Sequence, residues 1–315
     1  MGMNHRANLV LLRDLLRASR AVDRPVVTTP SMITPQEQAL LNGLASSYFT
    51  GMGSIIDAGI FLGASTNCLR DGLKSNPSYT DFEGPQIISF DLCECDEYMA
   101  NLINQLYGTS LKIGDDFSSL LLSNLGTSDA DVRLHIGDIR DQIPDREIEI
   151  LFLDICKAPA INDHILRAFF PKLIPGVSVV IHQDFVHESL PWIHVSMGLL
   201  SDYFDFVGVT GEFGPSAVYL CTKQLPVGLC DIYPIASLPV LRAAFAHAVA
   251  PLTEVQRYFV DLAFTRLLGA RGLMTEAVAE LDRLDRLYDR FRQLCTYLPS
   301  TDRHRARLGT PWTTV

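Results

Sequence analysis

Short apolar runs alternate with stretches of helical periodicity between residues 53 and 223, and this alternation limits the fold more than any other feature of the chain. The runs predict strands at 54–57, 86–91, 132–136, 149–154 and 177–181. Strands that are apolar at nearly every position are buried on both faces, as in a parallel sheet covered by helices on each side. The pattern therefore predicts an α/β fold built as a doubly wound, mostly parallel sheet.

Two further apolar runs, at 203–209 and 216–222, follow a helical stretch at 190–200. Gly211 and Gly214 separate them. A short connection that contains glycine is typical of two strands joined as a hairpin. These runs bring the predicted sheet to seven strands.

The segments on either side of this sheet have helical patterns. Before it, Thr34 and Pro35 predict a helix start, because Thr is a good N-cap and Pro suits the first helical position. After it, helices are predicted at 238–250, 252–268 and 277–298, and residues 301–315 are expected to be frayed. We therefore expect three parts: an N-terminal helical cap or lid (1–50), a ligand-binding α/β domain (51–224) and a C-terminal helical extension (225–315).

Charge and cysteine content narrow the class of protein. The chain has 26 Lys and Arg against 36 Asp and Glu, and its net charge of −10 repels a phosphate backbone. The most apolar N-terminal stretch, 9–16, contains Arg13 and Asp14, which predicts neither a signal peptide nor a membrane span. The seven cysteines are odd in number and sparse, unlike a disulfide framework. We expect a cytoplasmic protein that binds neither nucleic acid nor membranes.

A glycine-containing turn after the first predicted strand is the strongest candidate for a binding site. The strand ends at Asp57, Gly59 and Gly63 follow, and a helix begins with Ser65 and Thr66. Glycine lets the backbone adopt conformations and approaches that other residues resist, and a helix start offers unpaired N–H donors to a carboxylate or a phosphate. The turn therefore predicts a ligand at the carboxyl ends of the strands.

The neighbouring residues indicate which ligand. Asp91 ends the second predicted strand, where a carboxylate can accept the ribose hydroxyls of a nucleoside. A nicotinamide dinucleotide usually requires Gly-x-Gly-x-x-Gly, but Phe61 stands where the middle glycine would be. Asp57 would repel a diphosphate and can pair with an amine. These residues favour S-adenosylmethionine, which carries an ammonium group, a carboxylate and an adenosine.

At this point the chain resembles the class I S-adenosylmethionine-dependent methyltransferases. The resemblance covers about residues 30–223. Within the family, the chain most resembles the macrocin O-methyltransferase and cephalosporin-hydroxylase-like branch. It is carried by the motifs Asp57-x-Gly59-x-x-x-Gly63-x-Ser65-Thr66, Phe90-Asp91, Gly137-Asp138 and Phe152-Leu153-Asp154 before Pro175-Gly176. The resemblance implies a Rossmann-like methyltransferase fold with strand order 3-2-1-4-5-7-6, in which strand seven is antiparallel.

The resemblance also implies roles for single residues. Asp57 and Gly59 would hold the methionine moiety, in the turn that Gly63 completes, and Ser65 or Thr66 would lie near its carboxylate. Asp91 would bind the ribose, and Asp138 with Ile139 would flank the adenine. The 32 residues from Gly59 to Asp91 are more than this family usually has, and the surplus is assigned to an insertion at 75–85.

The catalytic residues are expected at the ends of the fourth and fifth predicted strands. Asp154 and Lys157 resemble a pair in catechol-type O-methyltransferases, where the aspartate binds Mg²⁺ and the lysine acts as the base. Asp154 and Asp184 are then the candidate metal ligands. The fifth strand ends in His182-Gln183-Asp184, however, and histidine is a poor ligand for magnesium. Without a metal, His182 is the candidate base, so both alternatives stay open.

Together these features predict an S-adenosylmethionine-dependent O-methyltransferase, a transferase acting on a small hydroxylated metabolite or sugar. Two alternatives remain. One is a nicotinamide-dependent sugar oxidoreductase. The other is a methyltransferase-like binding module without catalysis, which the replacement of an acidic pair by His182-Gln183 would fit. The helical extensions could join two copies of the chain as a homodimer.

Overall fold

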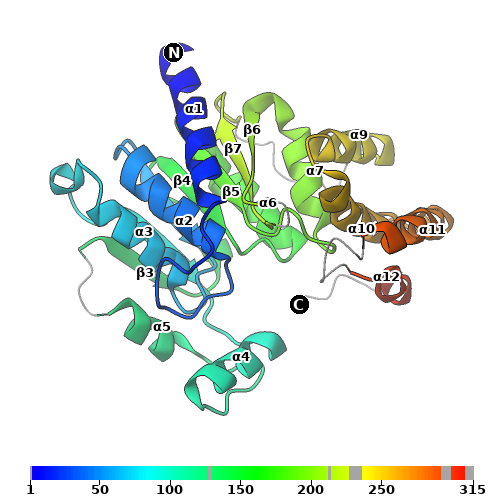
Figure 1. Ribbon diagram of the computed structural model, residues 1–315, viewed down its shortest axis with the longest axis horizontal. Coiled ribbons are helices and arrows are strands. Elements are labelled where there is room, and N and C mark those ends of the chain that lie inside the picture. Colours follow the sequence, from blue (N-terminus) through cyan, green and yellow to red (C-terminus); the bar gives the residue numbers. More distant parts are fainter. Residues whose placement is uncertain (1, 127–129, 212–213, 227–235, 292–298, 309–315) are drawn as a thin grey trace.

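The computed structural model describes residues 2–126, 130–211, 214–226, 236–291 and 299–308. In these residues, seven strands form a single sheet in the order β3-β2-β1-β4-β5-β7-β6 (Figure 1). The strands are β1 (Ser54–Ala58), β2 (Ile87–Asp91), β3 (Val132–Ile136), β4 (Ile148–Leu153), β5 (Val179–His182), β6 (Phe204–Val209) and β7 (Ala217–Cys221).

Strand direction divides the sheet into two parts. β1 to β5 pair in parallel, whereas β7 is antiparallel to both β5 and β6. Parallel neighbours need a crossover connection, whereas antiparallel neighbours can be joined by a short one, as 210–216 joins β6 to β7. The predicted fold class and strand order are confirmed, including the antiparallel seventh strand.

Helices lie on both faces and extend beyond the sheet. They are α1 (Gly2–Ser19), α2 (Pro35–Gly43), α3 (Ala64–Lys74), α4 (Glu97–Tyr107), α5 (Ser118–Leu125), α6 (Pro159–Ala168), α7 (Pro191–Leu199), α9 (Leu238–Val249), α10 (Glu254–Ala270), α11 (Met274–Phe291) and α12 (Thr301–Arg307). The predicted start of α2 is confirmed: Thr34 and Glu37 form a capping box, with Pro35 in the first turn. The prediction of frayed residues from 301 is wrong for α12, which Ser300 caps; residues 309–315 and 292–298 lie outside the described part.

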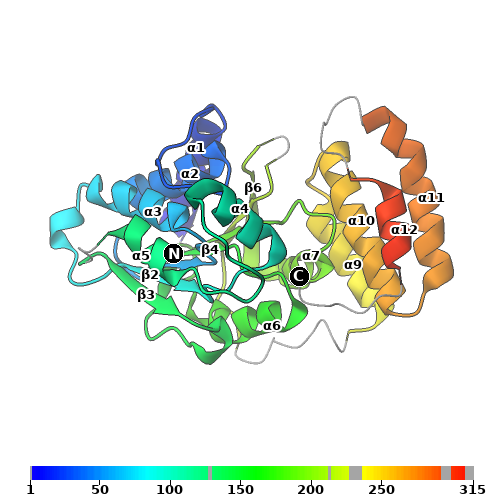
Figure 2. The same ribbon diagram turned by 90° about the horizontal axis from the view of Figure 1, so that it is seen from below.

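Alternate residues of the strands pack into two different cores. Ile55 of β1 and Phe152 of β4 belong to the core beneath α1, α2 and α3, whereas Ile56 and Leu153 belong to the core beneath α6 and α7. Successive side chains of a strand point to opposite faces, so an apolar residue at each position fills both layers. Figure 2 shows α1 to α3 on one side of the sheet and α6 on the other.

The C-terminal helices form a bundle at one end of the molecule (Figure 2). It joins the rest through α7 and α9, whose backbones nearly touch: a Cβ on Gly198 would lie 1.9 Å from the carbonyl oxygen of Ala244. The polar face of α11 pairs within the helix and between helices, since Arg283 contacts Glu280 of α11 and Asp261 of α10, each at 2.6 Å. The division at residues 50 and 224 and the homodimer stay predictions.

The structure bears on the membrane and disulfide predictions. Over the described ranges, no helix combines the length and the apolar character that crossing a membrane requires. Five cysteines are free and buried, namely Cys68, Cys93, Cys95, Cys156 and Cys221. Cys230 and Cys295 lie outside the described residues.

Candidate active site at the carboxyl edge of the sheet

Strained backbone marks the edge of the sheet at which β1, β2, β4 and β5 end, which we call the carboxyl edge. Among the described residues, three non-glycine residues have a positive φ: Phe61 (49°), Cys93 (58°) and Asp184 (61°). They follow β1, β2 and β5 respectively. Such conformations cost about 1–3 kcal/mol each and cluster at functional sites. Open α/β sheets also bind ligands at this edge, so the candidate site lies here.

Asp57 lies in β1 and is completely buried. Its Oδ2 accepts hydrogen bonds from the hydroxyls of Ser65 (3.0 Å) and Thr66 (2.6 Å) at the start of α3. Its Oδ1 is buried too and has no partner. Burial raises the pKa of Asp57 to about 7, and the two hydroxyls oppose that shift. Buried polar atoms are nearly always hydrogen-bonded, so an unpartnered carboxylate oxygen requires an explanation.

The two glycines of the turn are required by the protein's own packing. Gly59 has φ +87°, and a Cβ there would lie 2.3 Å from the carbonyl oxygen of Asp154. Gly63 has φ +92°, and a Cβ there would lie 2.9 Å from Cδ2 of Leu125. The left-handed conformation alone favours glycine at both positions. Gly59 thereby brings the turn into direct backbone contact with the end of β4.

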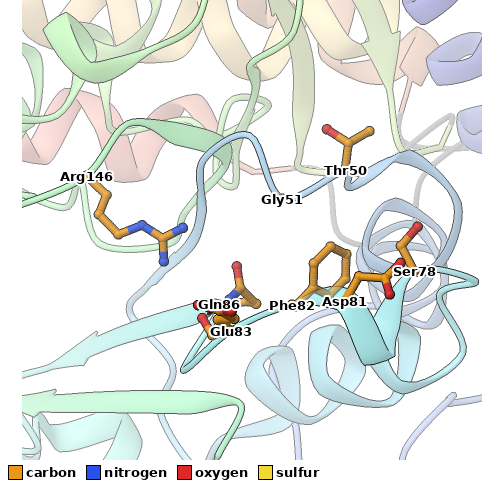
Figure 3. A pocket seen from close by; sticks show the side chains of 8 residues that line it. All are labelled: Thr50, Gly51, Ser78, Asp81, Phe82, Glu83, Gln86 and Arg146. Atoms are coloured by element: carbon orange, nitrogen blue, oxygen red, sulfur yellow. Dashed lines mark hydrogen bonds between the residues drawn. The ribbon is translucent and has the colours of Figure 1, made fainter.

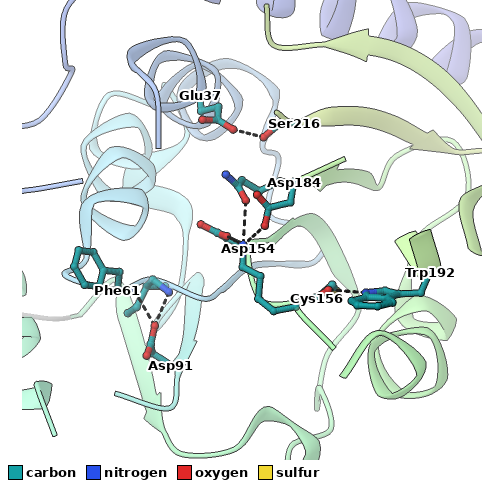
Figure 4. Close-up of polar contacts among 11 residues, drawn as sticks. Glu37, Phe61, Asp91, Asp154, Cys156, Asp184, Trp192 and Ser216 are labelled. Carbon is teal, nitrogen blue, oxygen red and sulfur yellow. Dashed lines mark hydrogen bonds and ion pairs between the residues drawn. The ribbon is translucent and has the colours of Figure 1, made fainter. Parts of the chain in front are cut away.

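Asp91 closes the turn after β1 (Figure 4). Its Oδ2 accepts the N–H groups of Ile60 and Phe61, both at 2.8 Å, and its Oδ1 accepts the N–H of Cys93 at 2.7 Å. The side chain is 7% exposed, and burial raises its pKa while these donors oppose the shift. A carboxylate accepts about four hydrogen bonds. The three present leave room for one ribose hydroxyl, not for the two expected.

Asp138 and Ile139 lie where β3 ends, but they have different surroundings. Asp138 caps a short 3₁₀ turn, accepting the N–H of Arg140 at 2.8 Å, and its hydrogen bonds with the Arg140 side chain lower its pKa. Ile139 is 2% exposed and packs in the core beneath α6. Their contact with an adenine ring stays a prediction.

Lys157 contacts the polar residues that follow β4 and β5, of which Asp154 and Asp184 lie close together in Figure 4. Its Nζ lies 2.8 Å from Oδ1 of Asp154 and 3.4 Å from Oε1 of Gln183, and it also contacts Oδ2 of Asp184. Asp154 and Asp184 are each 14% exposed, whereas Lys157 is 42% exposed. Asp154, Lys157 and Asp184, which were predicted as catalytic or metal-binding residues, are therefore in contact.

The predicted magnesium ligands do not fit a metal site in this arrangement. The ammonium of Lys157 stands between Asp154 and Asp184, where a bound cation would have to lie. Within the described ranges, no group of three or more His, Cys, Asp or Glu side chains is placed to hold a metal ion. The structure thus gives the Mg²⁺ prediction no support.

The structure gives no support to the prediction of His182 as the base. His182 is 1% exposed, and both ring nitrogens lack a hydrogen-bond partner. It shares a face of β5 with Val180, beneath α6 and α7, and its ring is 6.4 Å from that of Phe170. Burial lowers its pKa to about 3. A base should have a pKa near the working pH. The burial and the lowered pKa of His182 are those of a core residue.

Sequence analysis missed Glu37 as a residue of the site. It is 1% exposed; one carboxylate oxygen completes the capping box with Thr34, and the other accepts the hydroxyl of Ser216, 179 positions away (Figure 4). Burial is the largest cause that raises the pKa of Glu37, Asp57 and Asp91, and the negative charge of Asp154 adds to the shift. Acidic groups therefore cluster at the carboxyl edge, and those that are ionised favour a cationic ligand. Thr34 and Pro35 indicated the helix start but not this long-range contact.

A cavity of about 380 Å³ lies at the other edge of the sheet (Figure 3). Its lining includes Thr50 before β1, Gln86 before β2 and Arg146 before β4. The side-chain amide of Gln86 donates to the carbonyl groups of Glu83 (2.8 Å) and Gly84 (3.0 Å), so its N–H groups are used by hydrogen bonds within its own loop. None of the predicted site residues lines this cavity.

Comparisons with known proteins add little about function. No protein-family model matches the chain, and no curated protein matches it. The chain is similar to an apo structure of CalS11, a TDP-rhamnose 3'-O-methyltransferase of calicheamicin biosynthesis, with 16% identity, a TM-score of 0.43 and coverage of 70% of this chain and 95% of that one. It is also similar to the SAH-bound methyltransferase PaMTH1 of Podospora anserina, with 16% identity, a TM-score of 0.37 and coverage of 69% and 88%. At this identity and these TM-scores, the similarity does not assign a function to this chain.

Proposed function

We propose that this chain transfers a methyl group from S-adenosylmethionine to a hydroxyl oxygen of a small metabolite or sugar. The observation that carries the proposal is the unpartnered Oδ1 of Asp57, a buried carboxyl group whose pKa is raised first by burial and further by the negative charges of Asp154 and Asp91. An ammonium group is the donor that such an oxygen lacks. The cofactor, when bound, supplies that ammonium group and an electrophilic methyl on a sulfonium.

The contacts of the turn argue against a dinucleotide. A diphosphate at such a turn is bound by free backbone N–H groups of the turn and of the helix start. Three N–H groups of the turn are already used: those of Ile60 and Phe61 donate to Asp91, and that of Gly63 donates to the carbonyl group of Ile60 at 2.8 Å. A diphosphate would also approach the buried carboxylate of Asp57, with nothing in the turn to offset the repulsion.

The chain's own contribution to methyl transfer would be binding and orientation. Asp57 would bind the ammonium group, and Asp91 would hold a ribose hydroxyl with its remaining acceptor capacity. Lys157 and Asp154, which both follow β4, would bind the acceptor's hydroxyl group and direct its oxygen at the methyl. The hydroxyl proton would pass to the carboxylate of Asp154, and S-adenosylhomocysteine would leave. Holding two reactants in line is worth up to about 7–11 kcal/mol of the barrier.

Calorimetric titration with S-adenosylmethionine, S-adenosylhomocysteine and NADH tests the proposal. We expect both adenosyl ligands to bind and NADH to bind weakly, because the turn cannot accept a diphosphate. Asp57→Asn should weaken both adenosyl ligands by roughly tenfold or more, since its amide would face the ammonium group. The matched control is Asp71→Asn, an exposed position of α3. Unchanged binding to Asp57→Asn, or tighter binding of NADH, would overturn the assignment.

A further inference from the structure

Three oxygen atoms converge on one point beyond the ends of β4 and β5. The point is the Nζ of Lys157, and the oxygens are Oδ1 of Asp154 at 2.8 Å, Oε1 of Gln183 at 3.4 Å and Oδ2 of Asp184. Their residues come from two neighbouring strand ends, so the sheet itself brings them together. The convergence is a product of the tertiary fold.

This donor set has the chemistry of a cation site. Two carboxylates and one amide carbonyl are hard oxygen ligands, the kind that magnesium, manganese and calcium ions prefer. Asp184 holds its place with φ +61°, a conformation that costs a non-glycine residue about 1–3 kcal/mol. Its carboxylate contacts the ammonium group of Lys157.

We propose that Lys157 is the resident cation of this site: it takes the position of a divalent metal ion and presents its ammonium group to the acceptor's oxygen. An ammonium has three N–H donors. Two of them go to carboxylates, and the third makes the longest contact, to Gln183 at 3.4 Å. That third donor is the one an acceptor oxygen can take over. The occupancy of the site by Lys157 follows from the geometry alone, whereas its contact with an acceptor rests on the proposed function.

A consequence follows for the chain without this lysine. The pair of carboxylates carries two negative charges, which one ammonium neutralises in part and one divalent ion would neutralise in full. With Lys157 present, a divalent ion would meet a positive charge a few ångströms away. Truncating the side chain therefore should turn the site into a divalent-cation site, with Asp154, Gln183 and Asp184 supplying oxygens and water completing the shell.

The test is Mn²⁺ binding, followed by the electron paramagnetic resonance signal of the free ion and by calorimetry. We expect Lys157→Ala to bind one Mn²⁺ about tenfold or more tighter than the wild-type chain does. The gain should disappear when Asp184→Asn is added to Lys157→Ala. Lys157→Arg keeps a cation and should not gain the site. Lys74→Ala, at an exposed position of α3, is the matched control for loss of a lysine.

Several results would overturn the proposal. One is that Lys157→Ala binds Mn²⁺ no more tightly than the wild-type chain does. Another is that Lys74→Ala gains as much affinity for Mn²⁺ as Lys157→Ala does. Methyl transfer by the wild-type chain that stops with EDTA and returns with Mg²⁺ would overturn it as well. If Lys157→Ala fails to fold by circular dichroism, Lys157→Met, which keeps the side chain's apolar length, takes its place. Failure of the proposed function would show instead as a wild-type chain that binds no S-adenosylhomocysteine, whatever its Mn²⁺ binding.

Discussion

At the ends of β1 and β2, the carboxylates of Asp57 and Asp91 are buried and accept hydrogen bonds from their own turn and helix. At the ends of β4 and β5, by contrast, Lys157 is 42% exposed and its carboxylate partners are each 14% exposed. The first region is completed by backbone N–H groups and short hydroxyl side chains. The second depends on one long, flexible side chain that holds two strand ends together.

This difference suggests that the two regions have different roles, one in stability and the other in binding. Buried hydrogen bonds to backbone groups fix a shape, and their loss is felt in stability as well as in binding. An ion pair whose lysine is half open to water contributes little to stability. Substitutions should therefore separate the two regions, with the largest changes in the free energy of unfolding in the first.

The largest effect is expected from Gly59→Ala, which breaks the contact between the two regions. The new Cβ would lie 2.3 Å from the carbonyl oxygen of Asp154, at φ +87°. We expect a loss of about 4 kcal/mol in the free energy of unfolding, measured with urea. Gly84→Ala is the control, because φ is +67° there but no atom lies within 4 Å; it should lose about 1 kcal/mol. Equal losses would mean that the turn can move away from β4.

Asp91→Asn is expected to have the next largest effect. The amide has one acceptor oxygen, so its NH₂ group must face at least one of the N–H donors of Ile60, Phe61 and Cys93. Unfolding in urea should show a loss of about 2–3 kcal/mol. The comparison is Asp138→Asn, whose partner Arg140 is 53% exposed and whose loss should stay below about 1 kcal/mol. A smaller loss for Asp91 than for Asp138 would contradict the assigned rigidity of the first region.

Asp57→Asn should change how stability depends on pH. The pKa of Asp57 is raised to about 7 in the folded chain, so the folded state binds the proton more tightly than the unfolded state. Stability from this group is then lost as the pH rises toward 7, by about 2 kcal/mol between pH 5 and pH 7. The variant lacks this loss and should gain on wild type by that amount over the interval. A constant difference between the two unfolding curves would show that Asp57 is ionised throughout.

His182→Leu should show the opposite sign in stability and little change in activity. The pKa of His182 is lowered to about 3, so the unfolded state binds its proton first and stability falls as the pH drops below about 6.5. The variant should therefore gain on wild type by about 2 kcal/mol from pH 7 down to pH 5. Its methyl-transfer rate should stay within about threefold of wild type, and a loss of several hundredfold would restore His182 as the base.

Much of the architecture was predictable because it depends on local patterns. The seven strands, most helices and the capping box at Thr34 follow from periodicity, turn residues and N-cap preference, which act over a few neighbouring positions. The short helix α12 was missed because it depends on packing against α10 and α11, with Thr301 and His304 buried.

The candidate site was only partly predictable. The residues at the strand ends could be named, because parallel strands bring their carboxyl ends to one edge. The orientation of each side chain could not. Adjacent positions here have different surroundings. His182, the last residue of β5, packs in the core, whereas Gln183 and Asp184, which follow it, contact Lys157. Glu37 lies in the site and accepts a hydrogen bond from Ser216, a contact that no local pattern indicates.

The order of apolar runs, glycines and caps determined on its own that this chain forms a doubly wound sheet with a polar carboxyl edge, because those preferences belong to single residues and their near neighbours. Only the tertiary structure decided which atoms are satisfied within the protein and which are left for a ligand. Asp91 is nearly saturated, Asp57 keeps one oxygen without a partner, and Lys157 holds the place of a metal ion. Hydrogen bonding and burial depend on distances across the fold, and such distances are set only when all seven strands have paired.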